Sequence, residues 1–250
     1  MKLNLLLLMA GSSETFAQAG YVYPKNLVEI HGRPMLQHVL ENLARLTYPQ
    51  EKRMICVVRR DENLRYHTNS VISLIDPEAR IMELTGEAAG AACSALMAVD
   101  FIQNDDPLLI ANGDQVLDVD LNAMLADFDR RGLDGGVAVF RDIHPRWSFV
   151  KCNDQGEVIE AAEKRPISNL ATAGFYYFRR GADFVAAAQR MILKGASVNG
   201  HYYICPAYNE LVLKQRRIGV CEIPKSHYWS LATPASVDAY IERRARHTEP

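Results

Sequence analysis

The sequence predicts an α/β fold of three layers, with a mostly parallel mixed sheet between helices. Short apolar runs of strand length, such as Leu5–Met9 and Arg53–Val58, alternate with helical segments through the first half of the chain. In the second half, strand-like runs follow one another closely, and Asp154-Gln-Gly156 resembles a hairpin turn between two of them. The alternation of strands and helices in the first half favours a parallel sheet with helices on both faces. The closely spaced strands of the second half indicate that the whole sheet is mixed.

The individual elements follow from the same periodicities. A helix that buries one apolar face is expected after the first strand, over Met35–Leu46. The expected strands are Arg53–Val58, Arg80–Leu84, Pro107–Ala111, Gly135–Arg141, Phe149–Cys152, Val158–Ala162, Thr172–Arg179 and, at an edge, Arg217–Ile223. The other expected helices are Ala88–Ile102, Leu121–Arg131, Asp183–Leu193 and Tyr208–Leu213.

Composition limits the classes of function. The chain has 250 residues, 48% hydrophobic and 23% charged, without a linker or repeat, so we expect one domain over residues 1–250. The net charge is −2 and arginine pairs such as Arg59-Arg60 are scattered, as on solvated faces, so no nucleic-acid partner is expected. No stretch is long and apolar enough to predict a membrane span.

The first apolar run allows two interpretations. Lys2, the run Leu5–Leu8 and Ala17-Gln-Ala19 resemble a secretory signal peptide with its cleavage site. A buried strand is favoured, because the run is short and Glu14 precedes the small residues. The five cysteines are odd in number and mostly in apolar surroundings, which suits reduced thiols and a cytoplasmic protein.

Candidate site residues follow several predicted strands. Ligands of open parallel sheets bind at the carboxyl ends of the strands, which places Gly11–Thr15, Gly86–Gly90 and Asn112–Asp114 around one cleft. Asp114 is a candidate Mg²⁺ ligand, although a turn-forming Asp explains it equally well. Lys25 is placed to bind a phosphate, and its alternative is a solvated lysine.

Two further groups of residues are candidates. Glu163-Lys164 could bind a sugar hydroxyl and a phosphate, or could be an exposed hairpin end. Gly86 and Gly90 would let a flat base approach the backbone, or could mark a loop. The histidines and cysteines show no paired metal-ligand spacing.

The chain resembles the sugar-phosphate nucleotidyltransferases, a family that includes glucose-1-phosphate thymidylyltransferase. The resemblance runs nearly end to end. It rests on Met9-Ala-Gly11, Tyr23-Pro-Lys25, Gly32-Arg-Pro-Met35, Gly90–Leu96, Leu109–Gln115, Glu163-Lys164, Thr172–Phe178, Asn199–Tyr203, Tyr208–Leu211 and Trp229–Pro234. More narrowly, His144–Ser148 with Glu163–Ser168 resembles a bacterial branch found with capsule and surface-polysaccharide genes.

The resemblance implies a Rossmann-like, GT-A-like fold in which residues 1–132 bind nucleotide and 133–250 bind the acceptor. It implies that a sugar 1-phosphate or similar small phosphate attacks the α-phosphorus of a nucleoside triphosphate and releases pyrophosphate. Lys25, Asp114 and Lys164 would be catalytic, and Asp114 would hold the cofactor Mg²⁺. The implied nucleotide-binding residues are Ala10, Gly11, Ser12, Gly86, Gly90, Ala91, Asn112 and Gly113, and the implied substrate-binding residues are Glu163, Thr172, Gly174, Asn199 and Tyr203. The sequence leaves open whether the protein forms a homo-oligomer.

The chain departs from the family pattern in its first loop. The family has Gly, Ser and Arg where this chain has Ser13, Glu14 and Thr15, and it usually has Pro at Asn26. A left-handed backbone at Ser13 would cost about 1–2 kcal/mol, and the missing arginine–phosphate hydrogen bond at Thr15 about 1.5–3 kcal/mol. Residues 229–234 also lack the Asp that many members use as a second metal ligand.

These departures keep two alternatives open. One is a GT-A-type glycosyltransferase that uses a nucleotide sugar, because that chemistry handles a diphosphate. The other is a catalytically degenerate homologue that binds nucleotide or sugar phosphate and regulates another subunit.

Overall fold

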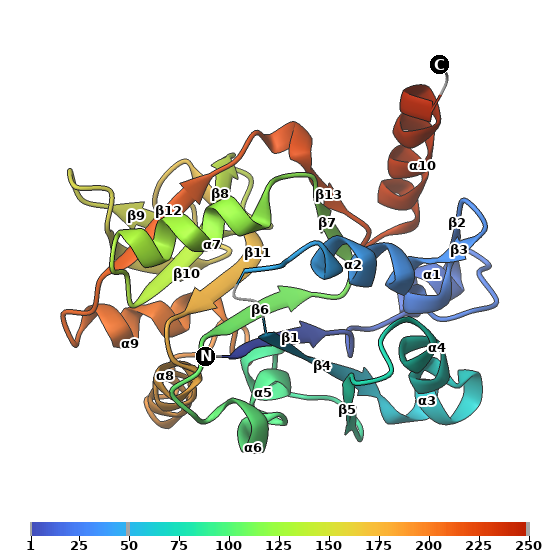
Figure 1. Cartoon of the computed structure of the whole chain (residues 1–250), viewed down its shortest axis with the longest axis horizontal. Helices are drawn as coiled ribbons and strands as arrows, with labels where there is room; N and C mark the ends of the chain where they lie inside the picture. The colour runs from blue at the N-terminus through green and yellow to red at the C-terminus, as the bar shows by residue number, and fades with distance from the viewer. Residues whose placement is uncertain (1, 49–50, 249–250) are drawn as a thin grey trace.

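The computed structural model describes residues 2–48 and 51–248, with the backbone alone for 245–248. Within this part of the chain, a nine-stranded sheet runs through the centre in the order β10-β9-β11-β6-β1-β4-β5, with β8 beside β11 and β12 beside β8 (Figure 1). Its strands are β1 (Lys2–Leu8), β4 (Glu51–Arg59), β5 (Arg80–Leu84), β6 (Leu108–Asn112), β8 (Gly135–Arg141), β9 (Ser148–Cys152), β10 (Val158–Glu163), β11 (Leu170–Phe178) and β12 (Ile218–Glu222).

Strand direction divides the sheet into two parts. Strands β6, β1, β4 and β5 are parallel, so that Leu5 of β1 lies between Met54 and Leu109. Strand β11 runs antiparallel to β6, β8 and β9, which makes the sheet mixed. The predicted α/β fold with a mixed sheet is confirmed.

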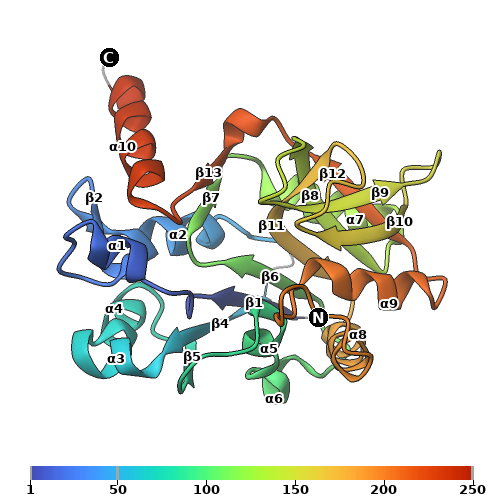
Figure 2. The same ribbon diagram turned by 180° about the vertical axis from the view of Figure 1, so that it is seen from behind.

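Alternating side chains of β1 supply two separate cores. Leu3, Leu5 and Leu7 pack with α2 (Met35–Ala44) and α7 (Leu121–Arg130) on one face. Leu6 packs on the other face, which is covered by α5 (Ala91–Leu96), α6 (Val99–Ile102), α8 (Gly181–Leu193) and α9 (Tyr208–Val212). Figures 1 and 2 show these helices on opposite sides of the sheet, which gives three layers.

The other elements lie around this framework. Helices α3 (Arg60–Tyr66) and α4 (Thr68–Ile75) follow β4, and the short α1 (Glu14–Gln18) follows β1. Two small sheets pair β2 (Glu29–Ile30) with β3 (Arg33–Pro34), and β7 (Gln115–Leu117) with β13 (Tyr228–Ser230). Helix α10 (Pro234–Thr248) extends away from the body (Figure 1). Within the described residues, every helix is too short or too polar to cross a membrane.

The helix expected over Ala88–Ile102 is wrong in its extent, because the chain forms the two short helices α5 and α6 there. Gly90 has a φ of 102°, outside the helical region, so α5 starts only at Ala91. A Cβ at Gly90 would lie 2.4 Å from the backbone oxygen of Tyr202. This close approach requires glycine and delays the start of the helix.

A register shift in β11 brings an irregular stretch of this strand against Asn112 and Gln115. The shift lies between Thr172 and Tyr176, and Gly174 within it has a φ of 68°. A Cβ at Gly174 would lie 2.4 Å from Oε1 of Gln115 and 2.6 Å from Nδ2 of Asn112. Gln115 Nε2 donates hydrogen bonds to the carbonyl oxygens of Ala173 and Gly174. The irregular part of β11 is thereby fastened to the start of β7.

We therefore expect Gly174→Ala to lower the free energy of unfolding by about 2–4 kcal/mol, because it adds a collision with two amides to the left-handed strain. Gly156→Ala is the matched control, since Gly156 has a φ of 74° with open space around it. It should lose only about 1–2 kcal/mol from strain. Urea unfolding measures both, and equal losses would contradict the packing argument.

Candidate active site

A cavity of about 570 Å³ opens at the carboxyl ends of the parallel strands. Leu8, Arg59, Leu84 and Asn112 line it from the ends of β1, β4, β5 and β6. Its opposite wall comes from the second half of the chain, through Arg146, Trp147, Ser148, Glu163, Thr172, Gly174, Tyr176, Tyr203, Ile204, Tyr228, Ser230 and Ala232. The two halves therefore face each other across one cavity.

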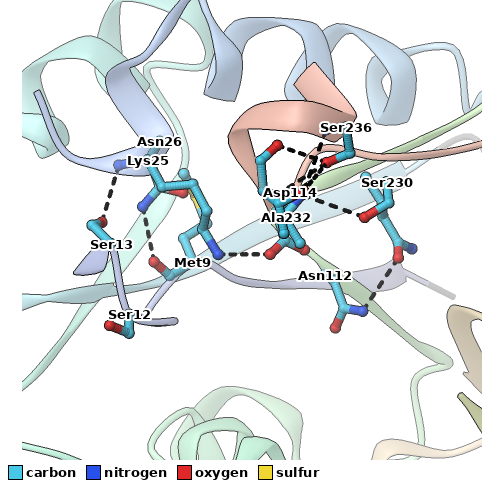
Figure 3. Close-up of polar contacts among 12 residues, drawn as sticks. Met9, Ser12, Ser13, Lys25, Asn26, Asn112, Asp114, Ser230, Ala232 and Ser236 are labelled. Atoms are coloured by element: carbon cyan, nitrogen blue, oxygen red, sulfur yellow. Dashed lines mark hydrogen bonds and ion pairs between the residues drawn. The ribbon is translucent and has the colours of Figure 1, made fainter. Parts of the chain in front are cut away.

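The loop after β1 carries Lys25 back to that strand's end. Asn26 is buried, and its Nδ2 donates to the carbonyl oxygen of Met9 at 2.9 Å (Figure 3). Proline, which the family usually has at this position, could not donate this hydrogen bond. Asn26 therefore links the two ends of the loop. A Cβ at Gly11 would lie 3.1 Å from Lys25 Nζ, and the glycine leaves room for the ammonium.

Lys25 and Asp114 form an ion pair at the centre of the cavity. Lys25 Nζ lies 2.6 Å from Asp114 Oδ2 (Figure 3), and the two side chains are 8% and 22% exposed. The backbone N–H of Leu231 donates to the backbone oxygen of Asp114 at 2.7 Å, which holds the chain after β13 against the end of β6. Both residues were predicted from their places after strands, and the structure brings them into direct contact.

Ser13 is not strained, contrary to the expectation for a left-handed loop. Its φ is −98°, which any residue adopts. Its hydroxyl donates to Glu62 Oε1 at 2.7 Å and accepts the backbone N–H of Lys25 at 3.0 Å. Thr15 is exposed and lies outside the linings of the cavities found in the described part of the chain. Ser13 thus supports Lys25, and Thr15 lies away from the cavity.

Most of the predicted nucleotide-binding residues line the cavity: Ala10, Gly11, Ser12, Gly90, Ala91 and Asn112. Gly86 and Gly113 are absent from the described lining. A Cβ at Gly113 would lie 2.5 Å from Cγ of Met9, so this glycine allows β6 to end close against the chain leaving β1.

From the second half of the chain, the predicted residues Glu163, Thr172, Gly174 and Tyr203 line the cavity. Glu163 is only 8% exposed and accepts a short hydrogen bond from the Ser148 hydroxyl. Burial raises the pKa of Glu163 above its usual value, and the bond from Ser148 opposes part of that rise. The carboxyl group of Glu163 is therefore partly desolvated, while it still lines the cavity.

Lys164 and Asn199 lie outside the described lining, although both were predicted to contact substrate. Lys164 has a φ of 52° and is exposed, and its Nζ donates to the Tyr203 hydroxyl at 3.1 Å. Lys164 thus reaches the rim of the cavity through Tyr203. Asn199 is exposed, with a φ of 51°.

Several lining residues were not predicted from the sequence: Arg59, Arg146, Ser148 and Tyr228. Arg59 was interpreted as part of a solvated pair, yet it directly follows a predicted strand, the signal that identified Asp114. The Arg146 guanidinium lies 4.2 Å from the centre of the Trp147 ring.

Asp142 holds this Trp147 wall in place. Trp147 Nε1 donates to Asp142 Oδ2 at 3.0 Å, and Lys225 Nζ lies 2.7 Å from the same oxygen. Burial alone would raise the pKa of Asp142, but these donors and two backbone N–H groups hold it well below its usual range. Asp142 therefore stays ionised and keeps the indole fixed.

A divalent cation here would depend on few ligands from the protein. Among the described residues, no three His, Cys, Asp or Glu side chains gather in a metal-binding group. Mg²⁺ is commonly held by one or two carboxylates together with substrate phosphates and water. Asp114 fits that pattern as one such ligand, because its carboxylate is part-exposed in the cavity.

Comparison with known proteins agrees with this architecture. Residues 5–214 match the model of the family described as nucleotidyl transferase. The chain belongs to that family.

Among relatives, it is 29% identical over 179 residues to the bifunctional protein GlmU of Methanocaldococcus jannaschii, covering 70% of this chain and 40% of that protein. It is 28% identical over 209 residues to the UTP–glucose-1-phosphate uridylyltransferase AglF of Haloferax volcanii, covering 80% and 79%. The crystal structure of a nucleoside-diphosphate-sugar pyrophosphorylase from Vibrio cholerae superimposes with a TM-score of 0.82 at 25% identity, covering 95% and 99%. The chain thus spans well under half of GlmU and most of the other two proteins.

Breaking the central ion pair should destabilise the protein. Asp114→Asn leaves the nearly buried Lys25 ammonium without its counter-charge, and we expect a loss of about 2–3 kcal/mol in the free energy of unfolding. Glu41→Gln, which breaks the exposed Arg33–Glu41 pair, should change it by less than about 0.5 kcal/mol. Chemical denaturation compares the two, and a similar small effect from both would contradict a buried, mutually dependent pair.

Glu163 should make stability depend on pH. Because its folded pKa is raised, ionisation opposes folding as pH rises from the ordinary value of 4.5 through the folded value. Glu163→Gln should therefore be more stable than the unmodified protein at pH 7–8, with the gap closing below about pH 4.5. Glu160→Gln is the control: this side chain of β10 is 42% exposed and pairs with Arg165, so its replacement should not stabilise the protein at pH 7–8. Thermal unfolding across pH tests this, and a gap that widens in acid would reverse the argument.

Proposed function

We propose that the protein joins a nucleoside monophosphate, taken from a nucleoside triphosphate, to a sugar 1-phosphate or similar small phosphate and releases pyrophosphate. The observation that supports this best is the Lys25–Asp114 pair, 2.6 Å apart in a cavity shared by the two halves of the chain. Family membership supports the same reaction class.

In the proposed reaction, a phosphate oxygen of the acceptor forms a bond to the α-phosphorus, and the bond to the pyrophosphate oxygen breaks. Little proton transfer is needed, so positioning and charge neutralisation dominate. Lys25 would neutralise the reacting phosphates, and Asp114 would hold Mg²⁺. When bound, the ion would screen phosphate charge and orient the nucleotide.

The acceptor would lie against the wall opposite the parallel strands. The Glu163 carboxylate would accept a hydrogen bond from a sugar hydroxyl, with Ser148 fixing its orientation. Thr172 Oγ1 and the Tyr176 hydroxyl are 2.9 Å apart in the cavity wall and add neutral polar contacts. Arg146 is the cation of this wall and would face the acceptor phosphate.

The biological setting is part of the proposal. The segments His144–Ser148 and Glu163–Ser168 support a place in bacterial surface-polysaccharide precursor synthesis. A cytoplasmic location, the assignment of residues 1–132 and 133–250 to nucleotide and acceptor, and the oligomeric state stay predictions.

Glycosyl transfer from a nucleotide sugar is the second candidate. Thr15 is exposed and away from the cavity, so the first loop brings no guanidinium to a triphosphate. A nucleotide sugar carries only a diphosphate and would not need that guanidinium. The same cavity would then cleave or transfer the sugar.

The reaction is tested by incubating the protein with Mg²⁺, each nucleoside triphosphate and a panel of sugar 1-phosphates. We expect pyrophosphate release for at least one pair, and Lys25→Met should lower kcat/KM by about 10²- to 10³-fold because it removes a charge that stabilises the transition state. Lys151→Met, on an exposed residue of β9, is the control and should leave the rate unchanged.

Other outcomes favour the alternatives. If no pair releases pyrophosphate, hydrolysis or transfer from a nucleotide sugar would support glycosyl transfer. Calorimetric binding of a nucleotide sugar without turnover would instead identify a binding homologue.

A further inference from the structure

Arg59 stands where two cavities meet. It is the last residue of β4, and together with Ser12 and Glu87 it lines both the main cavity and a second one of about 280 Å³. The second cavity extends along the first loop, past Ser13 and Glu14, and reaches the start of α3 at Asp61 and Glu62. Arg59 is therefore the guanidinium closest to the altered loop among the described lining residues.

The structure ties Arg59 to Lys25 through a short chain of polar contacts. Arg59 Nε lies 4.0 Å from Glu62 Oε1, and that oxygen accepts the Ser13 hydroxyl at 2.7 Å. The Ser13 oxygen accepts the backbone N–H of Lys25 at 3.0 Å. The altered residue Ser13 thus couples the loop to the strand end that carries Arg59.

The present partner of Arg59 is exchangeable. Arg59 makes a bidentate contact with Asp61, Nε to Oδ1 at 3.1 Å and Nη2 to Oδ2 at 2.8 Å. The Asp61 side chain is 66% exposed, whereas that of Arg59 is 20% exposed. Phosphate offers Arg59 the same fork of oxygens as the Asp61 carboxylate. Because Asp61 is largely exposed, its carboxylate can return to water when phosphate takes its place.

Of the cationic side chains that line the main cavity, one is placed to bind the leaving phosphates. Among the described residues that line the main cavity, the cations are Lys25, Arg59 and Arg146. Lys25 is held by Asp114 at the centre, and Arg146 stacks on Trp147 in the acceptor half. Arg59 is the remaining guanidinium on the nucleotide side, where the loop position Thr15 brings none.

We propose that Arg59 binds the terminal phosphates of the nucleoside triphosphate, in place of the guanidinium that the family carries on its first loop. The proposal rests on the proposed function and names the residue that holds the pyrophosphate portion. On binding, the Arg59 guanidinium exchanges Asp61 for phosphate oxygens, and Asp61 turns to solvent.

The test compares ligands that do and do not carry terminal phosphates. Calorimetry with Mg²⁺ present measures binding of the triphosphate that the unmodified protein prefers, of the matching monophosphate, and of inorganic pyrophosphate. Arg59→Gln should weaken triphosphate and pyrophosphate binding about 10- to 100-fold, as expected when a charge-assisted hydrogen bond is removed. Monophosphate binding should stay within about twofold.

Arg60→Gln is the matched control. Arg60 is the next residue, 56% exposed, pairs with Glu83 at 3.8 Å and lies outside the described cavity linings, so all three affinities should stay within about twofold. Arg59→Lys keeps the charge but loses the fork, and should give an intermediate loss confined to triphosphate and pyrophosphate. If Arg59→Gln does not fold, the binding data for Arg59→Lys test the proposal instead.

Two results would overturn the assignment. If Arg59→Gln weakens monophosphate and triphosphate binding equally, Arg59 contacts the base or supports the fold and does not bind the terminal phosphates. If triphosphate binding is unchanged, Arg59 does not bind the phosphates. If the unmodified protein binds pyrophosphate and no nucleotide, or no phosphate ligand at all, the proposed function itself fails. That outcome is visible before any variant is compared.

Discussion

The site depends on a charge pair that the fold partly shields from water. An ammonium as buried as that of Lys25 needs a counter-charge, and Asp114 supplies it from a different strand end. For the two to meet, the loop after β1 must close back on itself and the end of β6 must stay close to β1. Asn26, Ser13 and the backbone of Leu231 make these connections. The sheet, the loop and the segment after β13 are thus parts of one electrostatic arrangement.

Two of the cations that line the cavity are already paired with carboxylates. Lys25 contacts Asp114, and Arg59 contacts Asp61. A phosphate that binds Lys25 or Arg59 would therefore replace a carboxylate partner. Such exchange lowers affinity for any one phosphate, but it avoids the larger cost of an uncompensated buried charge.

Local pattern was enough to predict most of the sheet. The strands Arg80–Leu84 and Gly135–Arg141 have the predicted bounds, because apolar runs between polar turns are a local signal. Lys25 and Asp114 followed from the rule that ligands gather at strand ends. Arg59 was missed because an arginine pair has the composition of a solvated surface. Lys164 lies outside the described cavity lining, and its Nζ donates to the hydroxyl of Tyr203. Asn26 and Ser13 were interpreted only as losses, since their hydrogen bonds join residues far apart in sequence.

The close approach of Gly90 to Tyr202 has a consequence for how this protein can diversify. The N–H of Ala92 donates to the Tyr202 oxygen at 3.0 Å, and the N–H of Tyr202 donates to the Ala89 oxygen at 2.8 Å. Backbone atoms alone make this link, so side chains on both segments can change without breaking it, provided that position 90 stays glycine. Mutation can therefore alter the two walls independently while the spacing between them is inherited unchanged. A change in either wall alone can therefore alter which ligand binds there.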